Sequence, residues 1–186
     1  QLHNLGDPDA RAHFFATLPV RGRADGLIVV ASAIDTTEAA ALDALEIPVV
    51  VLGGDMPGRP RIGIDDRAGA RTAVRHLLGL GHRGVALVSF DPDEANGRAT
   101  TTDRRDGWAD AHAEAGRPRG PVVATGAGVA DGDAAAAELL SLPVMPTAVF
   151  AMSDELAVGV LRTLRRAGVA VPGQVSVVGF DDHDSA

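Results

Sequence analysis

Polar side chains that could bind a small molecule directly follow two predicted strands. Asp181 comes after the apolar run 175–180, and Ser153 and Asp154 come after the apolar run 147–152. Ligands of open α/β sheets bind beyond the carboxyl ends of the strands. A carboxylate at that edge can accept hydrogen bonds from two vicinal sugar hydroxyls. The sequence therefore predicts that Asp181, Ser153 and Asp154 contact a ligand.

The stretch 96–105 carries further polar groups between a predicted strand and the next helix. Its candidate ligand contacts are Arg98, Thr102 and Arg104, because a guanidinium group can donate paired hydrogen bonds to one partner. The alternative for each arginine is a solvated charge near a helix start. Both interpretations stay open for this stretch.

Helix capping is the structural alternative for the candidates at helix starts. Ser153 and Asp154 open a predicted helix, and so do Asp65 and Asp66. Side-chain oxygens at a helix start accept hydrogen bonds from unpaired backbone N–H groups, and carboxylates there complement the helix dipole. We expect the Asp65–Asp66 pair to cap its helix, whereas Ser153 and Asp154 can cap, bind a ligand or do both.

Motifs for catalysis, cofactors and metals fail on context. Gly79-x-Gly81-x-x-Gly84 has the letters of a dinucleotide fingerprint, but it follows a helix and opens a strand, the reverse of what pyrophosphate binding needs. No serine lies in a G-x-S-x-G elbow, and the histidines lack the spacing of a zinc motif. The acidic run 181–184 is extended, so adjacent side chains point to opposite sides. We therefore predict no catalytic residue, no cofactor and no metal.

The composition limits the partners of this chain. Among 186 residues the net charge is −8, and all seventeen basic residues are scattered arginines, which argues against nucleic-acid binding by this segment itself. Cysteine is absent, which excludes disulfides and fits a reducing cytoplasm. No run approaches the roughly 18 to 20 apolar residues that span a bilayer, so we predict no membrane partner.

Short apolar runs alternate with longer amphipathic stretches along the whole chain. Strands that are apolar on both faces and alternate with helices indicate a parallel sheet covered on both sides, an α/β doubly wound architecture. The predicted strands are 26–30, 47–52, 61–64, 84–89, 122–124, 147–152 and 175–180, and the predicted helices are 35–45, 66–80, 104–115, 131–142 and 154–167.

A hinge is predicted near Ile64 and Asp65, because the Pro-, Gly- and Arg-rich stretch 57–61 interrupts the alternation. The chain then holds two lobes with a sheet each. The predicted boundaries are 1–64 for a partial N-terminal lobe, 65–180 for a C-terminal lobe and 181–186 for a crossover back toward the first lobe.

Several segments, taken together and in order, resemble the LacI/GalR family of transcriptional regulators. The similar segments are Asp25-Gly26-Leu27-Ile28, Asp65-Asp66-Arg67-Ala68-Gly69-Ala70, Leu77-Leu78-Gly79-Leu80-Gly81-His82-Arg83, Arg104-Arg105-Asp106-Gly107-Trp108, the run 146–159 and the run 171–182. The resemblance implies a bilobed periplasmic-binding-protein-like fold, truncated here at both ends, with an effector in the cleft between the lobes. It also implies a homodimer and control of operator DNA through an N-terminal helix-turn-helix head outside this chain.

The resemblance assigns Asp181 to effector hydroxyls and places an effector-binding asparagine at Ser153. It also implies an arginine five residues before Gly107, where this chain has Thr102, and a polar pair where this chain has Gly53-Gly54. A sugar or sugar derivative is the implied effector, with a purine as the alternative because Arg98 is spaced as in the purine-responsive branch. A periplasmic-type solute receptor of an importer is the alternative function, and it would need a secretory signal upstream.

Overall fold

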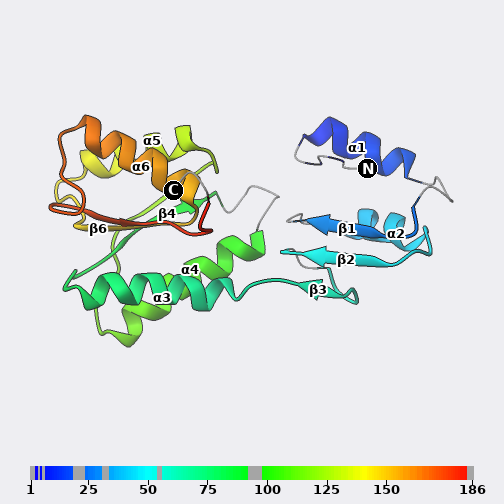
Figure 1. The fold of residues 1–186 in the computed structure, drawn as a ribbon, viewed down its shortest axis with the longest axis horizontal. Helices are drawn as coiled ribbons and strands as arrows, with labels where there is room; N and C mark the ends of the chain where they lie inside the picture. Colours follow the sequence, from blue (N-terminus) through cyan, green and yellow to red (C-terminus); the bar gives the residue numbers. More distant parts are fainter. Residues whose placement is uncertain are drawn as a thin grey trace. The chain divides into compact units, whose positions relative to one another are not determined.

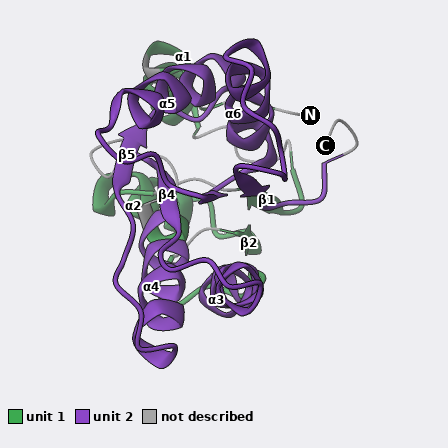
Figure 2. Cartoon of the chain, turned by 90° about the vertical axis from the view of Figure 1, so that its left-hand side faces the viewer, with its two compact units in different colours: residues 1–64, 94–100 green, residues 65–93, 101–186 purple. Residues whose placement is uncertain are grey.

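Two sheets, each with its own helices, make up the part of the chain that the structure describes. The computed structural model describes residues 3, 5, 7–18, 24–30, 34–53, 56–91 and 98–183. The chain divides into unit 1, Gln1–Ile64 with Glu94–Thr100, and unit 2, Asp65–Asp93 with Thr101–Ala186 (Figure 2). Both sheets are parallel, so the predicted α/β class is confirmed. The predicted crossover at 181–186 stays a prediction.

Unit 1 holds a three-stranded sheet in the order β1-β2-β3. Its buried core gathers Val29, Val49 and Val51 of the strands with Leu42 of α2. The helix α2 begins with a capping box, in which Asp35 and Glu38 bond each other's backbone N–H groups. The elements of unit 1 are α1 (Pro8–Thr17), β1 (Leu27–Val30), α2 (Thr36–Asp43), β2 (Val49–Leu52) and β3 (Arg61–Ile62).

Unit 2 holds a four-stranded parallel sheet in the order β5-β4-β6-β7. Helices α5 and α6 lie on one face of this sheet, and α3 and α4 lie on the other (Figures 1 and 2). The central strand β6 is buried throughout, as expected for a strand with both faces covered. The elements are α3 (Asp66–Gly79), β4 (Ala86–Phe90), most of α4 (Arg98–Glu114), β5 (Val122–Thr125), α5 (Val129–Ser141), β6 (Ala148–Ala151), α6 (Asp154–Arg166) and β7 (Ser176–Val178).

Two helices differ most from the sequence-based expectation. The helix α4 begins at Arg98 rather than at Arg104. Its first turn was missed because it is polar and shows no apolar period. The helix α1 was not expected at all, since its apolar residues form no single stripe, although Asp7 caps it and Pro8 occupies its first turn. In the described ranges no helix is long and apolar enough to cross a bilayer.

Glycines allow the helices of unit 2 to pack closely. A Cβ at Gly159 of α6 would overlap the carbonyl oxygen of Val129, and a Cβ at Gly132 of α5 would overlap the carbonyl oxygen of Leu156. The two helices therefore cross backbone against backbone. At Gly107 of α4, an added Cβ would likewise overlap a carbonyl oxygen of α3.

A buried histidine joins α4 to the start of the central strands. His112 accepts the N–H of Val85 at Nε2 (3.1 Å), and its Nδ1 lies 2.8 Å from the carbonyl oxygen of Trp108. The indole of Trp108 donates to the carbonyl oxygen of Val85 (2.8 Å). The Nδ1–H tautomer of neutral imidazole satisfies both contacts. Trp108 is a core residue.

The stability of the protein is expected to fall as the pH drops below about 6.5, in part through His112. Burial lowers the pKa of His112. The unfolded chain therefore takes up a proton first, and stability that is present above the unfolded pKa is lost as the pH falls toward the folded value. The check is the free energy of unfolding at pH 7 and pH 5 for the wild type and for His112→Gln, which we expect to be about 1–3 kcal/mol less stable at pH 7.

The difference between wild type and His112→Gln should shrink at pH 5. The exposed His76→Gln on α3 is the matched control for replacing a histidine with glutamine. An unchanged wild-type advantage over His112→Gln at both pH values would remove His112 from the pH dependence.

Candidate functional site

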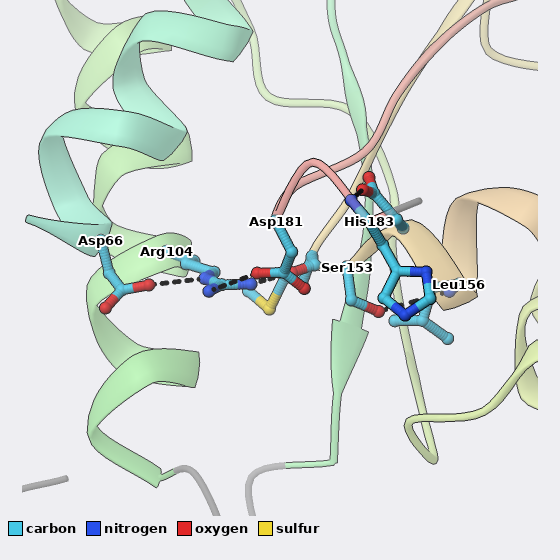
Figure 3. Close-up of polar contacts among 8 residues, drawn as sticks. Asp66, Arg104, Ser153, Leu156, Asp181 and His183 are labelled. Atoms are coloured by element: carbon cyan, nitrogen blue, oxygen red, sulfur yellow. Dashed lines mark hydrogen bonds and ion pairs between the residues drawn. The ribbon is translucent and has the colours of Figure 1, made fainter. Parts of the chain in front are cut away.

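The candidate site lies at the carboxyl edge of the unit 2 sheet. Asp181 follows β7, and Ser153 and Asp154 lie between β6 and α6. Arg104 of α4 and Asp66 of α3 reach the same edge from the helices on one face (Figure 3). The edge thus collects polar groups from four elements, where open α/β sheets bind their ligands.

Arg104 is the centre of this arrangement. Its Nε donates to Oδ1 of Asp66 at 2.7 Å, its Nη1 donates to the carbonyl oxygen of Met152, and its Nη2 donates to Oδ1 of Asp181 at 3.0 Å (Figure 3). The guanidinium carbon lies 3.7 Å from the centroid of the Phe180 ring. Arg104 is only 6% exposed. The side chain is held on every nitrogen and on one face, so it is fixed before any ligand arrives.

Asp181 is the accessible partner of this pair. Its side chain is 45% exposed, and Arg104 holds one of its two oxygens. From the residues that the structure describes, the other oxygen accepts no hydrogen bond. Burial raises the pKa of the Asp181 carboxyl, the positive charge of Arg104 opposes this rise, and the charges of Asp154 and Asp66 add to it. One oxygen is therefore free to accept ligand hydroxyl groups.

The backbone at Asp181 and Asp182 is in an unusual conformation. Their φ angles are +113° and +58°, in the region that residues with a Cβ seldom adopt. Such strain persists where the surroundings hold it, and it concentrates at binding sites. Here the ion pair from Asp181 to Arg104 and the bond from the His183 N–H to Oδ2 of Asp154 (2.7 Å) hold the segment.

Ser153 caps α6, as weighed for it, whereas Asp154 does not cap the helix. Ser153 is the N-cap of α6, and its hydroxyl accepts the N–H of Leu156 at 3.3 Å. Asp154 is buried, and its carboxylate binds the backbone of His183. Asp65 caps α3 in the same way, by accepting the N–H of Ala68 at 2.8 Å. Ligand contact by Ser153 and Asp154 stays a prediction.

The predicted loop around Arg98 and Thr102 is wrong, because the structure has a helix there. Both residues lie in α4 and not in a loop. Thr102 is exposed, and a helix turns about 100° per residue, so Thr102 lies about 160° around the axis from Arg104. The structure therefore does not bring Thr102 to Asp181. The side chain of Arg98 lies outside the described residues, as do Asn96 and Gly54.

Three members of the site were not predicted from the sequence. Asp66 was expected to cap α3, but Asp65 does so and Asp66 turns inward to Arg104. Phe180 stacks on Arg104 and lies over Gly69, where an added Cβ would come within 2.8 Å of the ring. The carbonyl oxygen of Met152 carries no sequence signal at all. The sequence held one hint for Asp66. Two adjacent aspartates stand at the start of α3, and one carboxylate is enough to cap a helix, so the second was available for another partner.

Metal binding finds no support in the geometry. Throughout the described ranges, no three His, Asp or Glu side chains are placed to hold a metal ion. His82, which follows the end of α3, instead bonds the hydroxyls of Thr147 at 2.9 Å and Ser176 at 3.1 Å.

Comparisons with known proteins show the family of this chain. Residues 74–186, more than half of the chain, match the family model of the periplasmic binding protein-like domain. The HTH-type transcriptional regulator DegA of Bacillus subtilis is 30% identical over 183 residues, which are 95% of this chain and 52% of that protein. The chain therefore spans about half the length of this curated relative.

Solved structures show the same fold. A LacI family transcriptional regulator from Enterococcus faecium with bound ribose superposes with a TM-score of 0.76 at 32% identity, covering 86% of this chain and 60% of that one. The transcriptional regulator CelR in complex with cellobiose superposes with a TM-score of 0.81 at 29% identity, covering 95% of this chain and 54% of that one.

Proposed function

Because the chain belongs to the family of periplasmic binding protein-like domains, as the effector-binding core of a LacI/GalR-type transcriptional regulator, we propose that it binds a sugar or sugar derivative at the carboxyl edge of the unit 2 sheet. In the complete protein this binding would change the affinity of a helix-turn-helix head for operator DNA. The complete protein would act as a homodimer in the cytoplasm.

The observation that carries the proposal is the fixed Arg104–Asp181 pair at the carboxyl edge. The pair presents a half-exposed carboxylate side chain beside a buried guanidinium that keeps unused N–H groups. A sugar hydroxyl can donate to the carboxylate and accept from the guanidinium at the same time. The ribose and cellobiose bound by two structural neighbours support a ligand of this chemistry.

Control of DNA binding would follow from unequal affinity for two states. A ligand shifts a conformational equilibrium only by the difference between its affinities for the two forms. The coupling between effector and operator is reciprocal and typically amounts to about 1–3 kcal/mol. Arg104 joins α3, α4 and the ends of β6 and β7. A ligand that displaces the Asp181 carboxylate would therefore change the contacts of Arg104 with all of these elements.

An importer receptor and an enzyme are less well supported. The matched relative is named as a transcriptional regulator, and both structural neighbours are regulators too. A purine effector, the sequence-based alternative to a sugar, remains a second arm of the ligand screen.

A thermal-shift screen of the complete protein tests the proposal. The panel contains ribose, glucose, cellobiose, amino sugars, sugar phosphates and purines. A ligand at 100 times its dissociation constant stabilises the folded state by about 2.7 kcal/mol. A higher melting temperature with a sugar supports the proposal. A higher melting temperature with purines alone would mean that the effector is a purine and not a sugar. No change in melting temperature with any compound of the panel contradicts the proposal.

Asp181→Ala is expected to weaken the binding of the sugar found in this screen by about 10- to 100-fold, because it removes the hydroxyl acceptor. Asp182→Ala is the matched control, since it changes the same residue type at a neighbouring exposed position with positive φ. Asp181→Ala should lose more stability than Asp182→Ala, because it also breaks the ion pair with Arg104, so unfolding is measured for both variants. Titration calorimetry checks the affinity, and equal affinity in wild type and Asp181→Ala would exclude Asp181 from the site.

A further inference from the structure

We propose that the carboxyl edge of the unit 2 sheet is electronegative and selects an uncharged or cationic effector over an anionic one. This inference rests on the proposed function, because it concerns the ligand of the same site. It follows from the charges of Asp66, Asp154 and Asp181 and from the way Arg104 is occupied.

Among the side chains that the structure describes at this edge, acidic groups outnumber basic ones. Asp66 and Asp181 share the single guanidinium of Arg104, at 2.7 Å and 3.0 Å. Asp154 binds only the backbone N–H of His183 among the described residues, and no arginine there forms an ion pair with it. Three carboxylates against one guanidinium leave a formal excess of two negative charges. Asp154 and Asp66 act on Asp181 electrostatically, since their charges raise its pKa.

Arg104 cannot offer an anion its usual paired hydrogen bonds. A carboxylate or phosphate binds arginine most strongly through two parallel N–H groups. Here Nε serves Asp66, Nη1 serves the carbonyl oxygen of Met152 and Nη2 serves Asp181. An anionic ligand would have to displace Asp181 or accept one N–H beside an unscreened carboxylate. The stacked Phe180 ring closes one face of the guanidinium as well.

A neutral polyol or an amino sugar is not repelled by the carboxylates and does not need paired N–H groups from Arg104. Its hydroxyl or ammonium group donates to the free oxygen of Asp181, and a hydroxyl can also accept one of the unused N–H groups of Arg104. The net charge of −8 on the chain repels anions at longer range in addition. The structure thus assigns the ligand class by charge rather than by shape.

The test compares matched sugars that differ mainly in charge. Ribose is paired with ribose 5-phosphate, and glucose is compared with glucosamine, glucose 6-phosphate and glucuronate. Titration calorimetry of the complete protein measures each affinity at low and at high salt. We expect each anionic sugar to bind at least about 10-fold more weakly than its neutral counterpart at low salt, and the gap to narrow at high salt because salt screens exposed charges.

Asp154→Asn is the variant that isolates the charge. It keeps an oxygen for the N–H of His183 but removes one negative charge, so the gap between neutral and anionic sugars should narrow. Glu155→Gln is the matched control, because it removes the same charge from the neighbouring exposed position of α6. It should leave the gap unchanged within about 2-fold, since Glu155 is exposed and water of high dielectric constant weakens its interaction with a ligand.

The outcomes separate this inference from the proposed function. Weaker binding of the anionic sugars, with a narrower gap in Asp154→Asn alone, supports the inference. Equal or tighter binding of an anionic sugar overturns it while the sugar-binding function stands. If no sugar of any charge binds, the proposed function is wrong and the inference falls with it.

Discussion

Replacing Arg104 with methionine is expected to abolish detectable effector binding and to lower the free energy of unfolding by about 3–5 kcal/mol. Methionine keeps much of the apolar stem, so the loss comes from the guanidinium. Asp66 is 7% exposed and would be left buried without its cation. Asp181 would lose the group that holds its carboxylate toward the ligand. Urea unfolding and titration calorimetry measure the two effects separately.

A double variant distinguishes lost binding from lost folding. Asp66→Asn combined with Arg104→Met removes the uncompensated buried carboxylate, so part of the stability should return. Binding should not return, because Asp181 remains unpaired. If the double variant is stable and binds the effector within about threefold of wild type, a difference near 0.65 kcal/mol, Arg104 does not position the site.

Gly159→Ala is expected to destabilise the protein by about 2–4 kcal/mol through overpacking. The added Cβ would overlap the carbonyl oxygen of Val129 and lie 2.7 Å from the amide nitrogen of Asp133. Both are backbone atoms, so α5 and α6 must move apart. This separation would strain the pair of Arg162 with Asp133, which also joins these helices. The higher helix propensity of alanine offsets only about 1 kcal/mol.

Gly79→Ala is the matched control for this prediction. Gly79 ends α3, has no neighbour within 4 Å of an added Cβ and has no positive φ. Alanine there should be neutral or stabilising by up to about 1 kcal/mol. Unfolding midpoints of both variants decide the matter. Similar midpoints for Gly159→Ala, Gly79→Ala and wild type would mean that the α5–α6 crossing has room to spare.

The alternation of apolar runs and helices was enough to predict the fold class, because parallel strands with both faces covered need continuous apolar runs. The strands β4 and β6 show this directly, since both are buried almost throughout. The pattern failed where apolar periodicity is absent. The first turn of α4, from Arg98, is polar, and α1 carries its signal only in the cap Asp7 and in Pro8.

Asp181 and Arg104 were named as candidates from the sequence, but the network that joins them could not be predicted. Asp181 and Arg104 were each expected to bind a ligand, yet their bond joins positions 77 apart in sequence, and only the packing of α4 against the sheet edge brings them together. Asp66 was missed because its neighbour Asp65 suffices for capping. Thr102 was assigned by spacing in an expected loop, and a helix turns that position away from the edge.

Effector binding at the carboxyl edge of the unit 2 sheet is tested most directly by mapping the bound sugar on the protein by nuclear magnetic resonance. The complete protein, labelled at selected residues, is titrated with the sugar that the thermal-shift screen identifies. We expect the largest saturable shifts on the Arg104 Nε–H and on the amides of residues 153, 154 and 181–183. Saturable binding that leaves these signals unchanged would place the effector elsewhere and contradict binding at the carboxyl edge of the unit 2 sheet.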